Sequence, residues 1–153
     1  MIDLETLSSR HDALILSIGA VAFNEEEIFE PGFYAAISID SQVEKYGRHI
    51  SDDTVAWWGK QSPEARKVLT DKKAIELPKA LKALSEYLRD VAEPKIWGYG
   101  ATFDNVILAN AFAAAGVKRP WSYQNDRCYR TLLALAGIQE IKRAGTTHNA
   151  IDD

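Results

Sequence analysis

The residues with the clearest chemical potential in this 153-residue chain are Asp3 and Glu5, which flank Leu4 near the N-terminus. In an extended strand alternate side chains project to the same face, so the two carboxylates would lie side by side. The two carboxylates would repel each other unless a cation lies between them or one of them takes up a proton. Oxygen-only ligands suit Mg²⁺ or Mn²⁺. Taken alone, the pair is more often simply solvent-facing charge at a chain end.

A third carboxylate, Asp104, follows a short apolar segment at 96–100 and opens an alanine-rich helix predicted over 103–115. A carboxylate at a helix start is stabilised by the helix dipole by about 0.3–1 kcal/mol, which is a purely structural explanation. In the functional interpretation, Asp104 leaves the end of a strand beside the first one and faces the same metal. Ligand sites concentrate where strands end and helices begin.

The last acidic element is the C-terminal sequence His148-Asn149-Ala150-Ile151-Asp152-Asp153. In one helix His148 and Asp152 would share a face, whereas Asp153 would lie about 140° round from the histidine. Periodicity alone therefore favours Asp152. However, two threonines just before the histidine suggest that a helix begins there, which would leave His148 in a loop. Taken alone, a histidine here is more often an ordinary surface residue than a catalyst.

The remaining sequence supplies elements that would position these residues. A nearly continuous apolar strand over 14–23, a polar turn at 24–27 and an extended segment over 28–39 predict an antiparallel hairpin. Helices and short strands then alternate, which predicts an α/β fold with helices packed on a mixed sheet. The further predictions are helices over 54–58, from Ser62-Pro63, over 77–91 and over 130–136, and strands over 96–100 and 127–129.

Composition predicts one soluble domain of 17.0 kDa, because 46% of its residues are hydrophobic and 26% are charged. The longest apolar run, 13–23, is too short to cross a bilayer, and no signal-peptide pattern is present, so we expect no membrane partner. The single cysteine, Cys128, favours a reducing cytoplasm. The formal charge is −4, from 22 acidic and 18 basic residues. Setting aside four acidic metal ligands balances these numbers, which is compatible with a metal-dependent nuclease but not with tight non-specific duplex binding.

The acidic elements together resemble the three ordered motifs of the DEDDh 3'–5' exonucleases, the branch of the proofreading-exonuclease superfamily with a histidine in its third motif. The matching residues are Asp3-x-Glu5, Tyr99-Gly100-Ala101-Thr102-Phe103-Asp104 and His148-x-Ala150-x-x-Asp153. The segments WWGKQSPEAR (57–66) and RCYRTL (127–132) are similar to exodeoxyribonuclease VIII-like 3'–5' exonucleases of bacteria and phages. The resemblance spans nearly the whole chain.

This resemblance implies a ribonuclease-H-like fold, a mixed five-stranded sheet flanked by helices with its first strand central. Asp3, Glu5, Asp104 and Asp153 would bind two Mg²⁺ or Mn²⁺ ions, and His148 would be the general base. The family's histidine precedes its aspartate by five residues, which selects Asp153 over Asp152. The expected reaction is two-metal hydrolysis of single strands at their 3' ends, releasing 5'-mononucleotides. The contact to the 2'-hydroxyl group that would distinguish RNA from DNA cannot be recognised in the sequence, although the resemblance favours DNA.

Two departures from the family pattern concern the ends of the chain. Only Met1 and Ile2 precede Asp3, whereas relatives have several apolar residues there. Relatives also continue past the last aspartate as a long helix. Residues 1–153 are therefore interpreted as a single 3'–5' exonuclease domain trimmed at both ends. Because relatives often pair, a homodimer is compatible with the resemblance.

Five residues are predicted to contact the substrate. Leu7 lies where relatives present an apolar wedge to the terminal bases. Trp57 and Trp58 could each stack on a base, at about 1–3 kcal/mol per base, or could divide between core and rim. Asn105 and Arg130 complete the set. Rival interpretations are a ribonuclease-H-like endonuclease, a non-catalytic nucleic-acid-binding domain and a small-molecule metallohydrolase of the same fold class.

Overall fold

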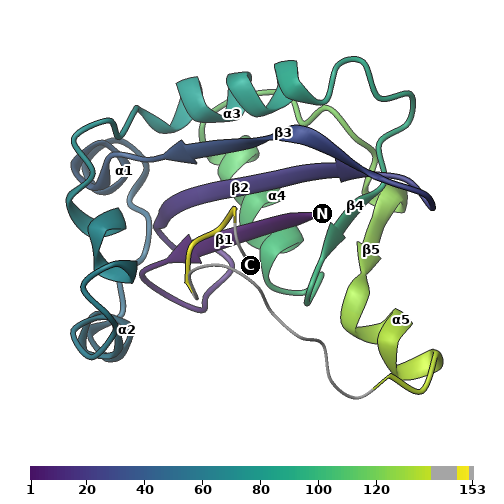
Figure 1. Ribbon diagram of the computed structural model, residues 1–153. Helices are drawn as coiled ribbons and strands as arrows, with labels where there is room; N and C mark the ends of the chain where they lie inside the picture. Colours follow the sequence, from purple (N-terminus) through teal and green to yellow (C-terminus); the bar gives the residue numbers. More distant parts are fainter. Residues whose placement is uncertain (139–147, 152–153) are drawn as a thin grey trace.

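A computed structural model, which describes residues 1–138 and 148–151, has one five-stranded sheet of order β3-β2-β1-β4-β5 (Figure 1). The central strand β1 pairs antiparallel with β2, and β2 pairs antiparallel with β3, while β4 and β5 run parallel to β1. This arrangement confirms the predicted mixed sheet with a central first strand. The strands are β1 (Ile2–Thr6), β2 (Ile15–Phe23), β3 (Ile28–Ala36), β4 (Ile96–Gly98) and β5 (Asp126–Cys128).

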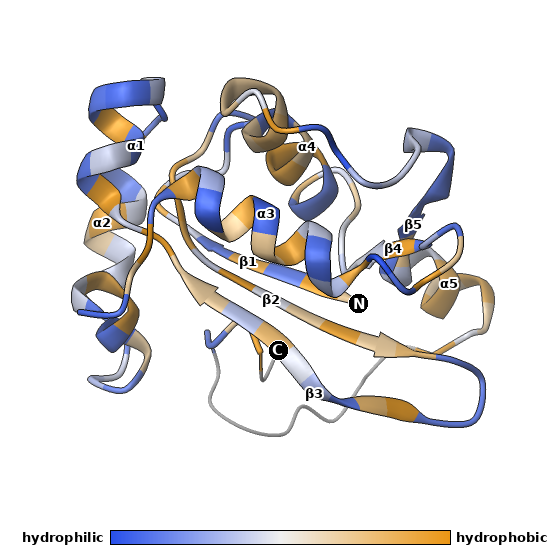
Figure 2. Cartoon of the chain, turned by 90° about the horizontal axis from the view of Figure 1, so that it is seen from above, coloured by the Kyte–Doolittle hydropathy of each residue, from blue (hydrophilic) through white to orange (hydrophobic). Residues whose placement is uncertain are grey.

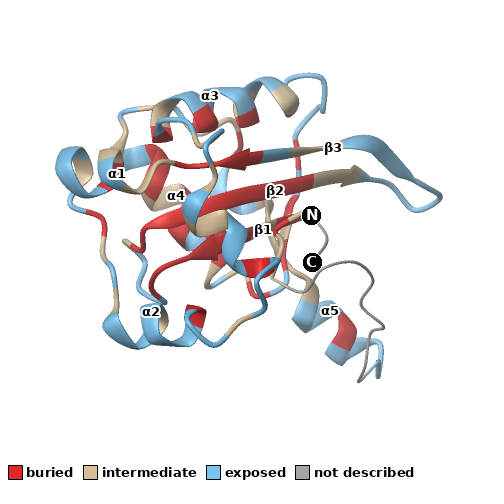
Figure 3. Ribbon diagram, turned by 60° about the vertical axis from the view of Figure 1, so that its left-hand side comes forward, coloured by how far each residue is buried: buried red, intermediate tan, exposed pale blue. Residues whose placement is uncertain are grey.

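The two faces of β1 have opposite character. Ile2 and Leu4 are 3% and 4% exposed and belong to the main hydrophobic core. Asp3 and Glu5 alternate with them and therefore project from the other face, as the sequence predicted. The middle of the sheet is buried, whereas the tip of the β2–β3 hairpin is exposed (Figure 3).

Two helices, α3 (Leu77–Tyr87) and α4 (Asp104–Ala114), pack on the Leu4 face and form the main core (Figure 2). The leucine periodicity of α3 was expected to extend to Val91, but the helix ends at Tyr87 and Val91 is 40% exposed. The predicted end of α4 is close to the observed one. Gly116 follows it with φ of 63°, a left-handed conformation that suits glycine.

A second, smaller core lies at one end of the sheet, beneath α2 (Asp52–Trp58) and the 3₁₀-helix η1 (Ala65–Thr70). The helix predicted from Ser62 is thus a 3₁₀-helix, and the Ala65 amide donates to Ser62 Oγ. The prediction that the extended segment reaches residue 39 is wrong, because β3 ends at Ala36 and α1 (Ile39–Tyr46) follows. The smaller core comprises Leu7, Leu14, Leu16, Trp58 and Ala65.

The C-terminal part of the described chain adds a short 3₁₀-helix, η2 (Tyr123–Asn125), and α5 (Tyr129–Leu135) beside the far edge of the sheet. The helix α5 stops before Gly137, whose φ is 71°, as the glycine predicted. Within the described ranges, none of the helices has both the length and the apolar character needed to span a membrane. Residues 148–151 form turns on the face that carries Asp3 and Glu5.

Candidate active site

The carboxylate face of β1 borders a pocket of about 460 Å³ that gathers residues distant in sequence. Asp3 and Glu5 belong to β1, and Trp57 belongs to α2. Phe103 directly precedes α4, and His148 lies in the C-terminal turn. Glu5 is only 8% exposed, so its carboxylate lies in a restricted space. Further lining residues are Leu4, Thr6, Ser8, Ser9, Asp53 and Thr54.

Asp104 lies at the start of α4 and reaches the central strand. Its side chain is buried, at 4% exposure, and its Oδ1 atom accepts a hydrogen bond from the Leu4 amide at 3.2 Å. Because Leu4 separates Asp3 from Glu5, this bond attaches the third carboxylate to the acidic pair. Burial raises the pKa of Asp104 to about 6, against the lowering effect of its backbone hydrogen bonds. A nearby cation would favour the ionised form of this carboxyl group.

His148 adopts a left-handed backbone conformation, with φ of 63°. Its ring lies 4.7 Å from the Trp57 ring, centroid to centroid, in an edge-to-face arrangement, and 6.3 Å from Trp58. The turn therefore directs the imidazole towards α2 and into the pocket that Asp3 and Glu5 line. The third predicted motif is thereby brought to the first, although its aspartates, Asp152 and Asp153, lie outside the described residues.

The carboxylates fit a divalent metal in their chemistry. Asp3, Glu5 and Asp104 offer oxygen atoms, the ligand type that Mg²⁺ and Mn²⁺ prefer. Within residues 1–138 and 148–151, no group of three or more His, Cys, Asp or Glu side chains is arranged so that it could hold a metal ion. The remaining predicted ligand, Asp153, lies outside these ranges, so the described residues supply only part of the ligand set.

Comparison with known proteins decides which family has this combination of fold and site. The family model of the 3'-5' exoribonuclease Rv2179c-like domain matches residues 1–153. The chain belongs to this family. An exodeoxyribonuclease of Enterobacteria phage T4 is 27% identical over 121 residues, which cover 72% of this chain and 53% of the relative. The chain thus spans about half the length of that relative. These similarities confirm the predicted enzyme class, a 3'–5' exonuclease of the DEDDh, ribonuclease-H-like type.

Three of the residues predicted to contact the substrate have buried side chains, and their contact with the substrate stays a prediction. Trp58 is 1% exposed, and its indole donates to the Thr6 carbonyl oxygen at 2.9 Å. Leu7 is 5% exposed and packs in the same small core, so it is not an exposed wedge. Asn105 is 2% exposed, and its amide donates to Ile96 O and Asp126 Oδ1. It links β4 to β5, a structural role.

The other two predicted contacts are accessible. Trp57 is 41% exposed and lines the pocket beside His148, so its ring can meet a base. Arg130 is exposed, but its guanidinium lies 5.9 Å from the Tyr99 ring centroid and close to Gly100. It therefore lies beside the turn that precedes Asp104, and it is not among the residues that line the pocket.

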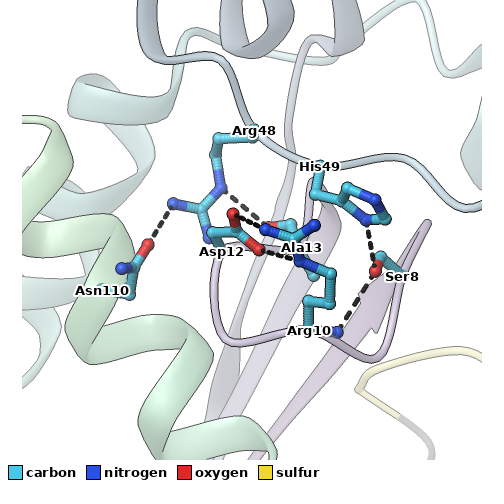
Figure 4. A network of polar contacts seen from close by, with 7 residues as sticks. All are labelled: Ser8, Arg10, Asp12, Ala13, Arg48, His49 and Asn110. Carbon is cyan, nitrogen blue, oxygen red and sulfur yellow. Dashed lines mark hydrogen bonds and ion pairs between the residues drawn. The ribbon is translucent and has the colours of Figure 1, made fainter.

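The loop after β1 contains a polar network that sequence inspection missed, because residues 6–12 resembled an ordinary polar loop (Figure 4). Ser8 is 2% exposed, with its Oγ atom 2.8 Å from His49 Nδ1 and accepting from the Arg10 amide. Arg48 is also buried and donates to Ala13 O and Asn110 Oδ1. Since Ser8 lines the pocket, its hydrogen bond with His49 helps to hold one wall of the pocket in place.

Trp58 is buried in the core and Trp57 lines the pocket, so substitution of the two residues should have different effects. Trp58→Ala is expected to destabilise the fold by about 3–5 kcal/mol, because a large buried ring leaves a cavity and the Thr6 carbonyl loses its donor. Trp57→Ala should change the free energy of unfolding by less than about 1 kcal/mol and should mainly lower nuclease activity. Urea denaturation and oligonucleotide turnover measure the two effects. Equal destabilisation by both variants would contradict this difference.

Proposed function

We propose that this exonuclease domain removes nucleotides one at a time from the 3' end of single-stranded nucleic acid and releases 5'-mononucleotides. One observation carries the proposal: Asp3, Glu5 and His148 line a single pocket, and Asp104 is hydrogen-bonded to the strand that bears the acidic pair. This combination suits metal-dependent phosphodiester hydrolysis, in which carboxylates bind metal and a neighbouring base accepts a proton.

The roles of the side chains follow from their chemistry. Asp3, Glu5 and Asp104, with Asp153, would hold two Mg²⁺ or Mn²⁺ ions. When bound, such ions stabilise the negative charge that develops on the phosphate and leaving oxygens. His148 accepts the proton of the attacking water, a role that suits an imidazole near neutral pH. The exposed ring of Trp57 stacks on the terminal base and keeps the imidazole oriented.

The comparisons point to two polymers. The family description names exoribonucleases, and the phage relative is called an exodeoxyribonuclease. Bases of both DNA and RNA could stack on Trp57, because every base has an aromatic face. The shared chemistry is a phosphodiester next to a free 3'-hydroxyl. Matched DNA and RNA strands therefore form the two arms of the test.

The polarity of digestion tests the proposal. With Mg²⁺ or Mn²⁺, a 3'-labelled single strand should lose its label at once as a mononucleotide, while a 5'-labelled strand shortens through a ladder. DNA and RNA strands of the same sequence, resolved on denaturing gels, show which sugar is accepted. A 3'-phosphate should block digestion, because the site must accept a free 3'-hydroxyl.

Each rival function predicts a different result in the same assay. Nicking of a closed circular single strand would indicate an endonuclease. Metal-independent binding without nucleotide release would indicate a non-catalytic binding domain. Turnover of small phosphodiesters with no digestion of either polymer would indicate a small-molecule metallohydrolase.

A further inference from the structure

A second pocket, of about 750 Å³, lies on the same face of the sheet as the candidate active site. Its walls come from β2 and β3, from η1 and from the turn that contains His148. Ser17, Tyr34, Lys67 and Asp71 are among its lining residues, and His148 borders both pockets. The residue proposed as the general base thus stands at the boundary between two cavities.

The strand register places this second pocket one strand away from the acidic pair. Ser17 of β2 is directly opposite Glu5 of β1, so their side chains share a face with Cβ atoms about 4.5–5.5 Å apart. Gly19 is opposite Asp3 on one side and Tyr34 on the other. A Cβ atom on Gly19 would overlap the Ala150 carbonyl oxygen, so the turn crosses β2 directly over this glycine.

The second pocket is lined by a buried hydroxyl group, that of Ser17. Ser17 is 1% exposed, and among the described residues its Oγ atom makes no hydrogen bond of good geometry, although the Tyr34 phenol is its polar neighbour. A buried hydroxyl without a hydrogen bond is unfavourable, so a ligand that supplies one would gain affinity. Tyr34 is 42% exposed and offers its ring to the same space.

We propose that this second pocket binds the nucleoside on the 5' side of the scissile phosphate. The inference rests on the proposed exonuclease function. A phosphate that lies beside His148 and the acidic pair carries one nucleoside on each side, and one pocket lies on each side of His148. Glu64 and Asp71 outnumber Lys67 among the charged residues that line the second pocket. Its charge therefore suits the neutral sugar and base better than a further phosphate.

The assignment of the two nucleosides follows from the contents of the pockets. The terminal nucleoside is recognised by its 3'-hydroxyl, and the smaller pocket contains the hydroxyl side chains of Thr6 and Thr54 together with the Trp57 ring. The larger pocket contains Tyr34, on which the preceding base stacks, and the Ser17 hydroxyl, which exchanges a hydrogen bond with the nucleoside.

Two substrates that share the terminal nucleotide test this assignment. In the dinucleotide TpT, water adds to phosphorus and the P–O3' bond breaks, which gives thymidine 5'-monophosphate and thymidine. In thymidine 5'-(p-nitrophenyl phosphate), p-nitrophenol replaces the preceding nucleoside, so the second pocket has no base to bind. Uridine counterparts are used if the oligonucleotide assay selects RNA.

Tyr34→Ala should lower kcat/KM for the dinucleotide about 5- to 150-fold, the range for loss of one base–aromatic stack. The same variant should change kcat/KM for the p-nitrophenyl ester by less than about 2-fold. Tyr34→Phe should restore dinucleotide turnover, because it keeps the ring. Ser17→Ala, which changes the fold little, should also lower kcat/KM for the dinucleotide more than kcat/KM for the ester. Tyr123→Ala is the matched control, because Tyr123 is 70% exposed on η2.

The outcomes separate the inference from the function on which it rests. Equal losses on both substrates, or no loss on either, would overturn the assignment of the second pocket. Failure of the unmodified protein to hydrolyse dinucleotide, ester and oligonucleotide would instead overturn the proposed function. A loss confined to the dinucleotide, with rescue by Tyr34→Phe, supports the assignment.

Discussion

Replacing Asp104 with asparagine is expected to lower the rate of 3'-terminal nucleotide release by about 10²–10⁴-fold. Metal ions contribute several kcal/mol to the stabilisation of charge in such transition states, and a neutral amide is a much weaker metal ligand than a carboxylate. Asparagine has the same shape and can still accept the hydrogen bond from the Leu4 amide, so the local structure should persist. Initial rates at saturating Mg²⁺ or Mn²⁺, compared with unmodified protein, measure the loss.

The same substitution should stabilise the metal-free protein at neutral pH. Burial raises the pKa of Asp104 from 3.8 to about 6. The folded state therefore binds this proton more tightly than the unfolded state, and stability falls as pH rises from about 4 to 6 and stays lower above that. Asparagine does not ionise. At pH 8 in a chelating buffer Asp104→Asn should thus be more stable than the parent, by up to about 3 kcal/mol, and below pH 4 this difference should disappear.

A matched control separates this effect from a general change of charge. Asp90 is exposed after α3, so Asp90→Asn removes the same charge from the surface. It should change neither activity nor the pH dependence of urea denaturation measurably. Full activity in Asp104→Asn would remove Asp104 from the metal site, and destabilisation at pH 8 would contradict the burial of an ionised carboxylate.

The parts of the fold that the sequence predicted are those with strong local signals. Alternation over Ile2–Thr6 and the polar turn at 24–27 define the central strands, because period-two patterns and turn residues act over a few neighbours. The helix α1 was missed because its sequence, IDSQVEKY, is short and mostly polar. Its position depends on a tertiary contact, since the buried Gln42 side chain bonds both Ile15 N and Ile15 O.

The family motifs predicted which residues lie near the candidate site. They did not predict which neighbouring side chains are buried, because tertiary packing determines burial. Trp57 and Trp58 are adjacent and chemically identical, and tertiary contacts distinguish them: Trp58 packs in the small core and donates to the Thr6 carbonyl oxygen. Leu7 follows an irregularity in the pairing of β1 and β2 between Glu5 and Thr6, beyond which the chain packs into the small core. Asn105 adjoins Asp104 in sequence, yet its amide points to β4 and β5. Proximity in sequence to a motif therefore did not predict which of these side chains are exposed.

Removing the imidazole of His148 is expected to lower turnover by about 10²–10⁴-fold, the usual contribution of general acid–base catalysis. The choice of substitution matters, because the backbone at this residue has φ of 63°. Asparagine tolerates the left-handed region better than alanine, so His148→Asn removes the base with little added strain, and His148→Ala serves as the second variant. Oligonucleotide turnover between pH 5 and 9 is the measurement.

The pH profile distinguishes a base from a residue that only packs against Trp57. The unmodified rate should be lower at acid pH than at pH 9, because only a neutral imidazole accepts a proton, and both variants should lose this pH dependence. Metal dependence should change little, since the proposed ligands are carboxylates. His11→Ala is the matched control, because His11 is exposed on the loop after β1 and lines neither pocket. A uniform loss at every pH, equal to that of Trp57→Ala, would show that His148 supports the pocket wall and that another group takes the proton.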